Sequence, residues 1–151
     1  MRHYRSDSPE AAARIVAACL LSDGHVGIDE LEALDRYGME ERLQMNRGQL
    51  LAVMQQMCED LTTTAYLNWG DACRLDPAVV FGLAQDIKDW RLRREIIALC
   101  EEGAQADGHI SDPEALFIRT LHAAWYMPGA REIYESPRSR ERLTLARTPP
   151  G

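Results

Sequence analysis

The fold is decided by a short stretch that occurs twice, as SDGHVGIDE at residues 22–30 and as ADGHISDPE at residues 106–114. Both copies contain Asp-Gly-His, then Val or Ile, and end in Glu. The second copy follows the first by 84 residues without a gap. The same offset aligns the apolar phase of the preceding segments: Ala12 with Ile96, Ile15 with Leu99, Val16 with Cys100, Cys19 with Gly103 and Leu20 with Ala104. This agreement predicts a helix–turn–helix hairpin that is present twice, packed as a pseudo-symmetric pair.

Helix-capping chemistry alone accounts for much of this turn. The glycine after Asp23 and after Asp107 suits a left-handed helix stop. In the second copy, Ser111 and Glu114 have the spacing of a capping box. Gly27 replaces that serine in the first copy, where the Glu still favours the positive end of the helix dipole. These interactions require no ligand.

The rest of the chain carries helix signals and almost no strand signals. Residues 8–135 are predicted to form one all-α domain, a bundle of about seven helices. Residues 1–7 and 136–151 are expected to be flexible ends. The predicted elements are a helix from Ser8 to the Asp23-Gly24 turn, a helix over 28–37, a short turn over 40–43, a long helix capped by Asn46, and helices opened by Asp76-Pro77, Asp89 and Ser111.

The composition is that of an ordinary globular protein of 151 residues, with 46% hydrophobic residues, 27% charged residues and a net charge of −7. The acidic balance argues against nucleic-acid and anionic-membrane binding. The longest apolar run, Ile15 to Leu21, is too short to span a membrane, and the N-terminus lacks a signal-peptide pattern. The four cysteines form no CxxC pair and indicate reduced core residues. We therefore expect a cytoplasmic protein.

A second interpretation of the repeated turn is a divalent-cation site. Asp-Gly-x-Ile-x-x-x-Glu matches the second half of an EF-hand loop, but the residues at the first two ligand positions cannot supply carboxylates. Two meeting hairpins would pool Asp23, Glu30, Asp107 and Glu114. Such oxygen ligands suit Ca²⁺, Mg²⁺ or Mn²⁺. The equivalent His25 and His109 are additional candidate ligands that would shift the preference toward Zn²⁺ or Mn²⁺, although a solvated turn position is the commoner role.

The second copy with its flanks, EEGAQADGHISDPEALFIRTL, resembles the TerB-like tellurite-resistance family, and the similarity extends over about residues 8–127. The resemblance implies an all-helical fold, an association with stress responses to tellurite and related oxyanions, and an acidic metal-binding surface. Carried over by position, that surface would use Asp23 and Glu30 from the first copy and Asp107 and Glu114 from the second. Gly27 and Ile28 depart from the polar residues usual after the turn.

No nucleophile elbow, phosphate-binding glycine loop or HExxH motif is present, so the sequence does not predict an enzyme. Two function classes follow: a TerB-like stress protein that binds a divalent cation, and a metal-free helical module that binds a protein partner. The positions of two other side chains are also predicted. His122 is expected in the core beside Ile118, and Trp90 is expected to fill a corner between helices.

Overall fold

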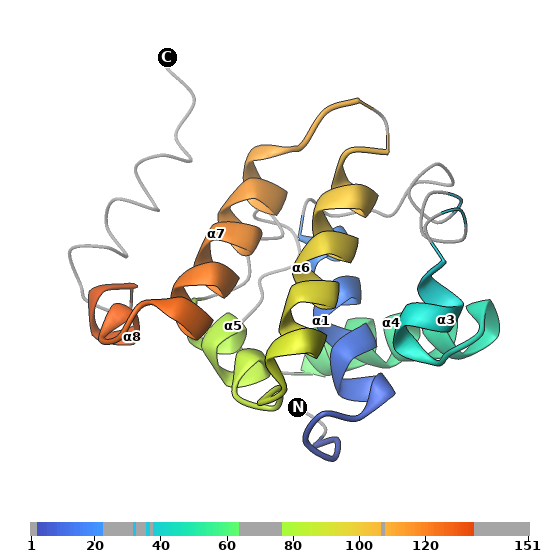
Figure 1. Ribbon diagram of the computed structural model, residues 1–151, viewed down its shortest axis with the longest axis horizontal. Coiled ribbons are helices and arrows are strands. Elements are labelled where there is room, and N and C mark those ends of the chain that lie inside the picture. Colours follow the sequence, from blue (N-terminus) through green and yellow to red (C-terminus); the bar gives the residue numbers. More distant parts are fainter. Residues whose placement is uncertain are drawn as a thin grey trace.

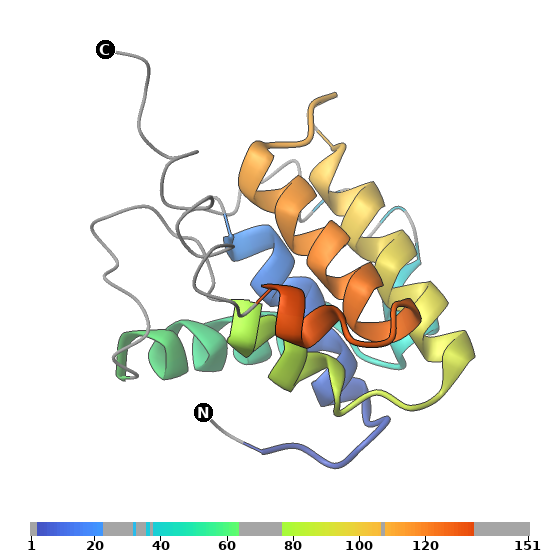
Figure 2. The same cartoon turned by 90° about the vertical axis from the view of Figure 1, so that its left-hand side faces the viewer.

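The computed structural model describes residues 3–22, 32, 36, 38–63, 77–106 and 108–134. The secondary structure of these residues is helical, which confirms the all-α class (Figures 1 and 2). Most of the helix predicted over 28–37, and the tail predicted over 136–151, lie outside the described residues. The described helices are α1 (Pro9–Leu21), α3 (Met39–Leu43), α4 (Arg47–Thr63), α5 (Pro77–Ala84), α6 (Trp90–Ala104), α7 (Asp112–Tyr126) and α8 (Ala130–Tyr134).

The predicted helix starts are confirmed by their capping hydrogen bonds. The Ser8 hydroxyl accepts from the backbone N–H of the third residue after it at 3.1 Å, and a proline opens α1. Asn46 and Gln49 cap α4 reciprocally, each side-chain oxygen accepting from the other residue's N–H. The Asp89 carboxylate caps α6. These local signals determine where the helices begin.

Helix α1 is the centre of the molecule and contacts α3, α4, α5, α6 and α7. Every residue from Ala11 to Leu21 is buried. Its small and aliphatic residues occur around the whole circumference of the helix. A helix that is apolar on all sides is stable only when surrounded. The other helices therefore pack around it.

The repeat is visible in the burial pattern. The five residue pairs aligned by the 84-residue offset are all buried. The helices that carry them, α1 and α6, pack against each other, and α6 also packs against α7 (Figure 1). The predicted equivalence of the two helices therefore holds for their core-facing residues.

The N-terminal segment before α1 is tied to the loop that precedes α6. The Asp7 carboxylate accepts from the backbone N–H of Lys88 at 2.6 Å and of Asp89 at 3.1 Å. On α1, the buried Arg14 pairs with Asp86 of the same loop at 2.5 Å. Arg14 also stacks on the ring of Tyr4, with 4.8 Å to the ring centroid. The contacts of Asp7 and of Arg14 with the loop before α6 join residues that are 72 to 82 positions apart in sequence.

Two side-chain predictions are wrong, and one element is additional. His122 is exposed, because the buried face of α7 centres on Phe117 and Leu121 and His122 lies about 100° around the helix from Leu121. Trp90 is 56% exposed, because it opens α6 beyond the edge of the core. Trp125 fills a corner instead: its indole N–H donates to the Ala84 carbonyl at 2.9 Å. The short helix α8 was not predicted.

Candidate functional site

The second copy of the repeated turn joins α6 to α7. Helix α6 ends at Ala104, before the predicted stop, and further backbone turns continue to Gly108, whose N–H donates to the Gln105 carbonyl at 2.8 Å. Gly108 has a φ of +83°. This left-handed conformation explains why glycine is present. Ile110 is partly buried against the core and anchors the turn, as its apolar side chain predicted.

The predicted capping box at the start of α7 is confirmed. The Ser111 hydroxyl accepts from the Glu114 N–H at 3.3 Å. In return, Glu114 Oε1 accepts from the Ser111 N–H at 3.2 Å and from its hydroxyl at 2.7 Å. Glu114 is 2% exposed, so its carboxylate lies inside the molecule at the helix N-terminus. The carboxylate therefore lies where the positive end of the helix dipole and the Ser111 donors meet.

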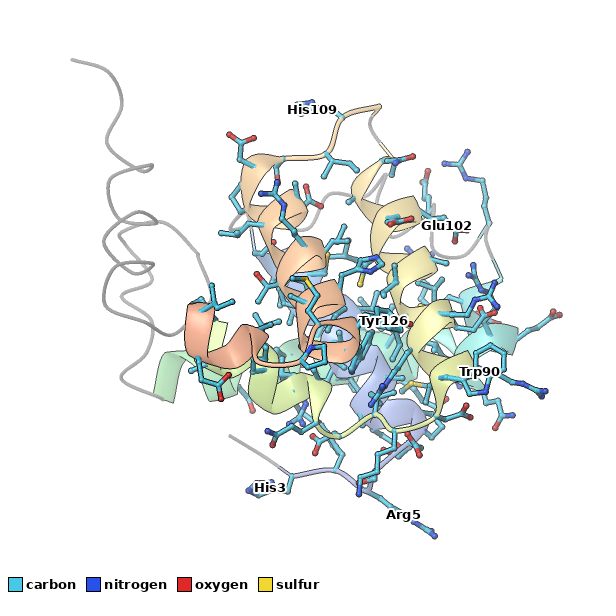
Figure 3. All side chains as sticks on the ribbon, turned by 60° about the vertical axis from the view of Figure 1, so that its left-hand side comes forward. His3, Arg5, Trp90, Glu102, His109 and Tyr126 are labelled. Carbon is cyan, nitrogen blue, oxygen red and sulfur yellow. The ribbon has the colours of Figure 1, made fainter. Side chains whose placement is uncertain are left out.

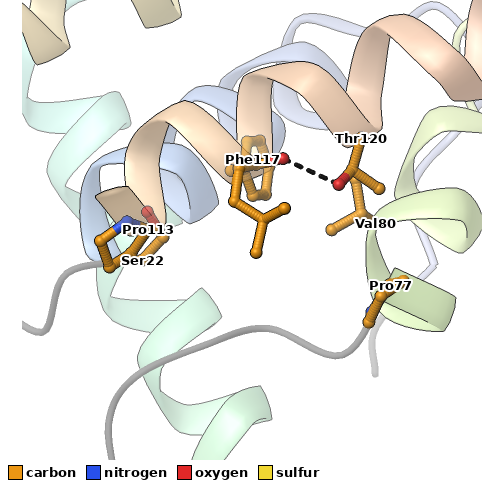
Figure 4. Close-up of a pocket in the computed structure, with 7 residues that line it drawn as sticks. Ser22, Pro77, Val80, Pro113, Phe117 and Thr120 are labelled. Atoms are coloured by element: carbon orange, nitrogen blue, oxygen red, sulfur yellow. Dashed lines mark hydrogen bonds between the residues drawn. The ribbon is translucent and has the colours of Figure 1, made fainter. Parts of the chain in front are cut away.

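Ser22, the one residue of the first copy that the structure describes, lines a small cavity together with Pro113 of the second copy, and the two lie at the same end of it (Figure 4). Ser22 directly precedes Asp23, and Pro113 directly precedes Glu114. The cavity has a volume of about 20 Å³. That is room for roughly one water molecule. The remaining walls come from α5 and α7 and include Val80, Phe117 and Thr120. The chain therefore enters the first turn beside the start of α7.

The predicted site residues are only partly within the described residues. Asp23, His25, Glu30 and Asp107 lie outside them. His109 is exposed at the tip of the α6–α7 turn (Figure 3), whereas Glu114, in the first turn of α7, is buried. In the part of the chain that is described, no group of three His, Cys, Asp or Glu side chains could hold a metal ion. The structure thus does not bring His109 and Glu114 into one described ligand set.

A second cluster of charged groups connects α3 with α6, and the sequence analysis missed it. Arg42 pairs with Glu95 and, at 2.6 Å, with Glu102. Burial opposes the charge of the Arg42 guanidinium, but the hydrogen bonds to Glu95 and Glu102 outweigh it and raise the pKa of Arg42. The only available signal was the spacing of Glu95 and Glu102 by seven residues, which places them on one face of a helix.

The start of α6 presents a further feature that was not predicted as a site. An open hollow there is lined by Trp90, Arg91, Arg94, Glu95 and Ala98, which we call the Trp90 surface. It lies at the opposite end of α6 from His109 (Figure 3).

Comparison with models of protein families, with curated proteins and with solved structures finds no match to this chain. A search of the described helices finds none with the length and apolar character needed to cross a membrane.

Proposed function

We propose that this chain is a non-catalytic helical module of the TerB type, a stress-response protein whose two repeated turns hold one divalent cation between them. The proposed ligands are Asp23 and Glu30 from the first turn and Asp107 and Glu114 from the second. Carboxylate oxygens of this kind select Ca²⁺, Mg²⁺ or Mn²⁺.

The observation that supports this proposal is that Ser22 and Pro113 line one small cavity together. Each of these residues directly precedes a proposed ligand, Asp23 in one case and Glu114 in the other. A shared ion requires the two turns to be neighbours, and the shared lining of one cavity supports such an arrangement. The repeat offset adds support on the side of α6, where five of the six buried residues are those that it aligns with α1.

Glu114 has the most constrained role in this proposal. Its Oε1 atom is engaged by two Ser111 donors, and its Oε2 atom is also inaccessible to solvent. Binding an ion through Glu114 would therefore require the capping box to share or release the carboxylate. For this reason the proposal depends most on Asp23 and Asp107, which follow the two helices at equivalent positions.

Thermal unfolding of the chelator-treated protein, with and without each cation, tests the proposal. An ion at 100 times its dissociation constant adds about 2.7 kcal/mol, which raises the melting temperature by several degrees in a chain of this size. We expect that rise in the wild type and its loss in Asp23→Asn/Asp107→Asn. Asp112→Asn is the matched control, because Asp112 is an exposed acid in the first turn of α7 with no equivalent acid in the first copy. Equal shifts in both variants, or none in the wild type, would contradict the proposal.

A metal-free protein-binding scaffold is the second candidate. The complete capping box favours it, since Glu114 faces its own helix N-terminus and stabilises the turn without an ion. For this candidate, Glu114→Gln leaves stability nearly unchanged with and without cations, because glutamine also completes a capping box.

A further inference from the structure

The Trp90 surface combines an exposed tryptophan with two flanking arginines, which the start of a helix does not need for its stability. Trp90 is 56% exposed although it is the largest side-chain type. Its ring is flanked by two arginines, whose guanidinium carbons lie 5.5 Å (Arg91) and 5.8 Å (Arg94) from the indole ring centroid. Tryptophan and arginine are also the residues most enriched at the energetic centres of protein interfaces.

The positive charges of Arg91 and Arg94 are not balanced by a neighbouring acid. Within the described residues, neither arginine forms an ion pair. The nearest acid in sequence, Glu95, is paired with Arg42, and Asp89 accepts the backbone N–H of Arg91 as the cap of α6. At 5.5 and 5.8 Å from the ring centroid, the two guanidinium groups lie beside the indole at the outer range of cation–π attraction, and their N–H donors stay available to a ligand.

The Trp90 surface is extended by a second hollow that adjoins the first. The first is lined by Trp90, Arg91, Arg94, Glu95 and Ala98. The second runs toward α3 and the N-terminal segment, and it shares Arg91 and Glu95 with the first. Leu43 and Leu92 contribute apolar wall to the second hollow. Asp7, Asp89 and Glu95 line the second hollow as well, so the carboxylates of a bound segment would lie at the first hollow, beside Arg91 and Arg94.

We propose that the Trp90 surface binds an acidic, leucine-containing segment of a protein partner, with carboxylates on Arg91 and Arg94 and an apolar side chain beside Trp90. Charge complementarity identifies the occupant: two unneutralised guanidinium groups stand side by side on a protein of net charge −7. Guanidinium groups bind carboxylates through paired N–H donors. A nucleic-acid strand fits less well, because its phosphates repeat along the whole strand and would meet Asp7, Asp89 and Glu95, whereas a peptide can place its carboxylates at the two arginines alone. This interaction goes beyond cation binding and does not require it.

Fluorescence anisotropy with three labelled probes tests the interaction: the peptide EELEELEELE, its counterpart QQLQQLQQLQ, and a thymidine decanucleotide. We expect the acidic peptide to bind in chelator-containing buffer, with affinity that falls as salt increases. Arg91→Gln/Arg94→Gln should weaken it about tenfold, since two exposed ion pairs are lost together. Trp90→Ala should weaken it as well, whereas binding of the glutamine peptide should be much weaker throughout.

Arg119→Gln is the matched control, because Arg119 is an exposed arginine on α7 outside the surface. It should change the affinity less than about twofold. Circular dichroism and the melting temperature establish that each variant is folded, which we expect because all three substituted positions of the surface are exposed. An equal effect of Arg119→Gln would show non-specific attraction and overturn the proposal. Absence of acidic-peptide binding, or tighter binding of the oligonucleotide through the same arginines, would also overturn it.

Discussion

The capping box at the start of α7 makes the sharpest prediction, because the same Glu114 side chain is either a cap or an ion ligand. Replacing Glu114 by alanine removes two accepted hydrogen bonds, at 3.2 and 2.7 Å, from a site that is 2% exposed. Hydrogen bonds to charged groups contribute about 1.5–3 kcal/mol to stability. We expect Glu114→Ala to lower the free energy of unfolding by about 2 kcal/mol.

Glu114→Gln separates the hydrogen bonds from the charge. The amide oxygen still accepts from Ser111, so only the interaction with the helix dipole is lost, about 0.3–1 kcal/mol. Ser111→Ala should cost about 1 kcal/mol, as is usual for an N-cap. The double variant Ser111→Ala/Glu114→Ala should cost about 0.5–1 kcal/mol less than the sum of the single changes, because the two residues share their bonds.

Urea unfolding followed by circular dichroism measures these differences from the midpoint at constant slope. Asp112→Ala is the control, an acid in the same first turn that is exposed. It should cost less than about 0.5 kcal/mol, since only a dipole interaction is removed. Equal destabilisation by Glu114→Ala and Glu114→Gln would show that the hydrogen bonds of Glu114 with Ser111 do not stabilise the start of α7. A loss of stability in Asp112→Ala as large as in Glu114→Ala would show the same.

Three further predictions follow from other described contacts. Gly108→Ala should destabilise the protein by about 1 kcal/mol and Gly108→Asn by less, because φ is +83° while no atom lies within 4 Å of an added Cβ; thermal melts of the two variants compare them. Asp86→Ala should cost about 2–4 kcal/mol in urea unfolding, because it leaves the buried Arg14 without its 2.5 Å partner carboxylate, itself partly exposed. Hydrogen bonds from the backbone N–H of Asp89 and then of its neighbour lower the pKa of Asp7 below 3.8. The stabilisation by Asp7 is therefore fully present above its unfolded pKa and lost as the pH falls through the folded value. Because Asn tolerates the φ of +60° at this position, the melting temperatures of wild type and Asp7→Asn should converge as the pH falls below about 4.

Local signals predicted the described helices well, because each helix start is decided by a few neighbouring residues. Ser8, Asn46, Asp89 and Ser111 all cap the helices they were expected to cap. The repeat offset also predicted five of the six buried residues of α6. These features depend on the spacing and hydrogen-bonding groups of residues that are neighbours in the sequence.

Long-range contacts were not predictable in the same way. The pairing of Arg14 with Asp86 crosses 72 positions, and the bonds from Arg42 to Glu95 and Glu102 join different helices. Nothing in the local pattern distinguishes these residues from solvated charges. His122 shows the related problem at a helix surface, where a shift of one residue moves a side chain about 100° out of the core. Burial was also predicted wrongly for Trp90, because at the end of a helix a hydrophobic side chain can lie beyond the core.

The most direct test of the proposed cation site is calorimetric titration of chelator-treated protein with Mn²⁺ and with Ca²⁺. We expect one bound ion per chain in the wild type, the same in Asp112→Asn, and no saturable binding in Asp23→Asn/Asp107→Asn. Absence of saturable binding in the wild type, or an unchanged titration in Asp23→Asn/Asp107→Asn, would contradict the proposed cation site. The repeated Asp-Gly-His turn would then serve only as a helix cap.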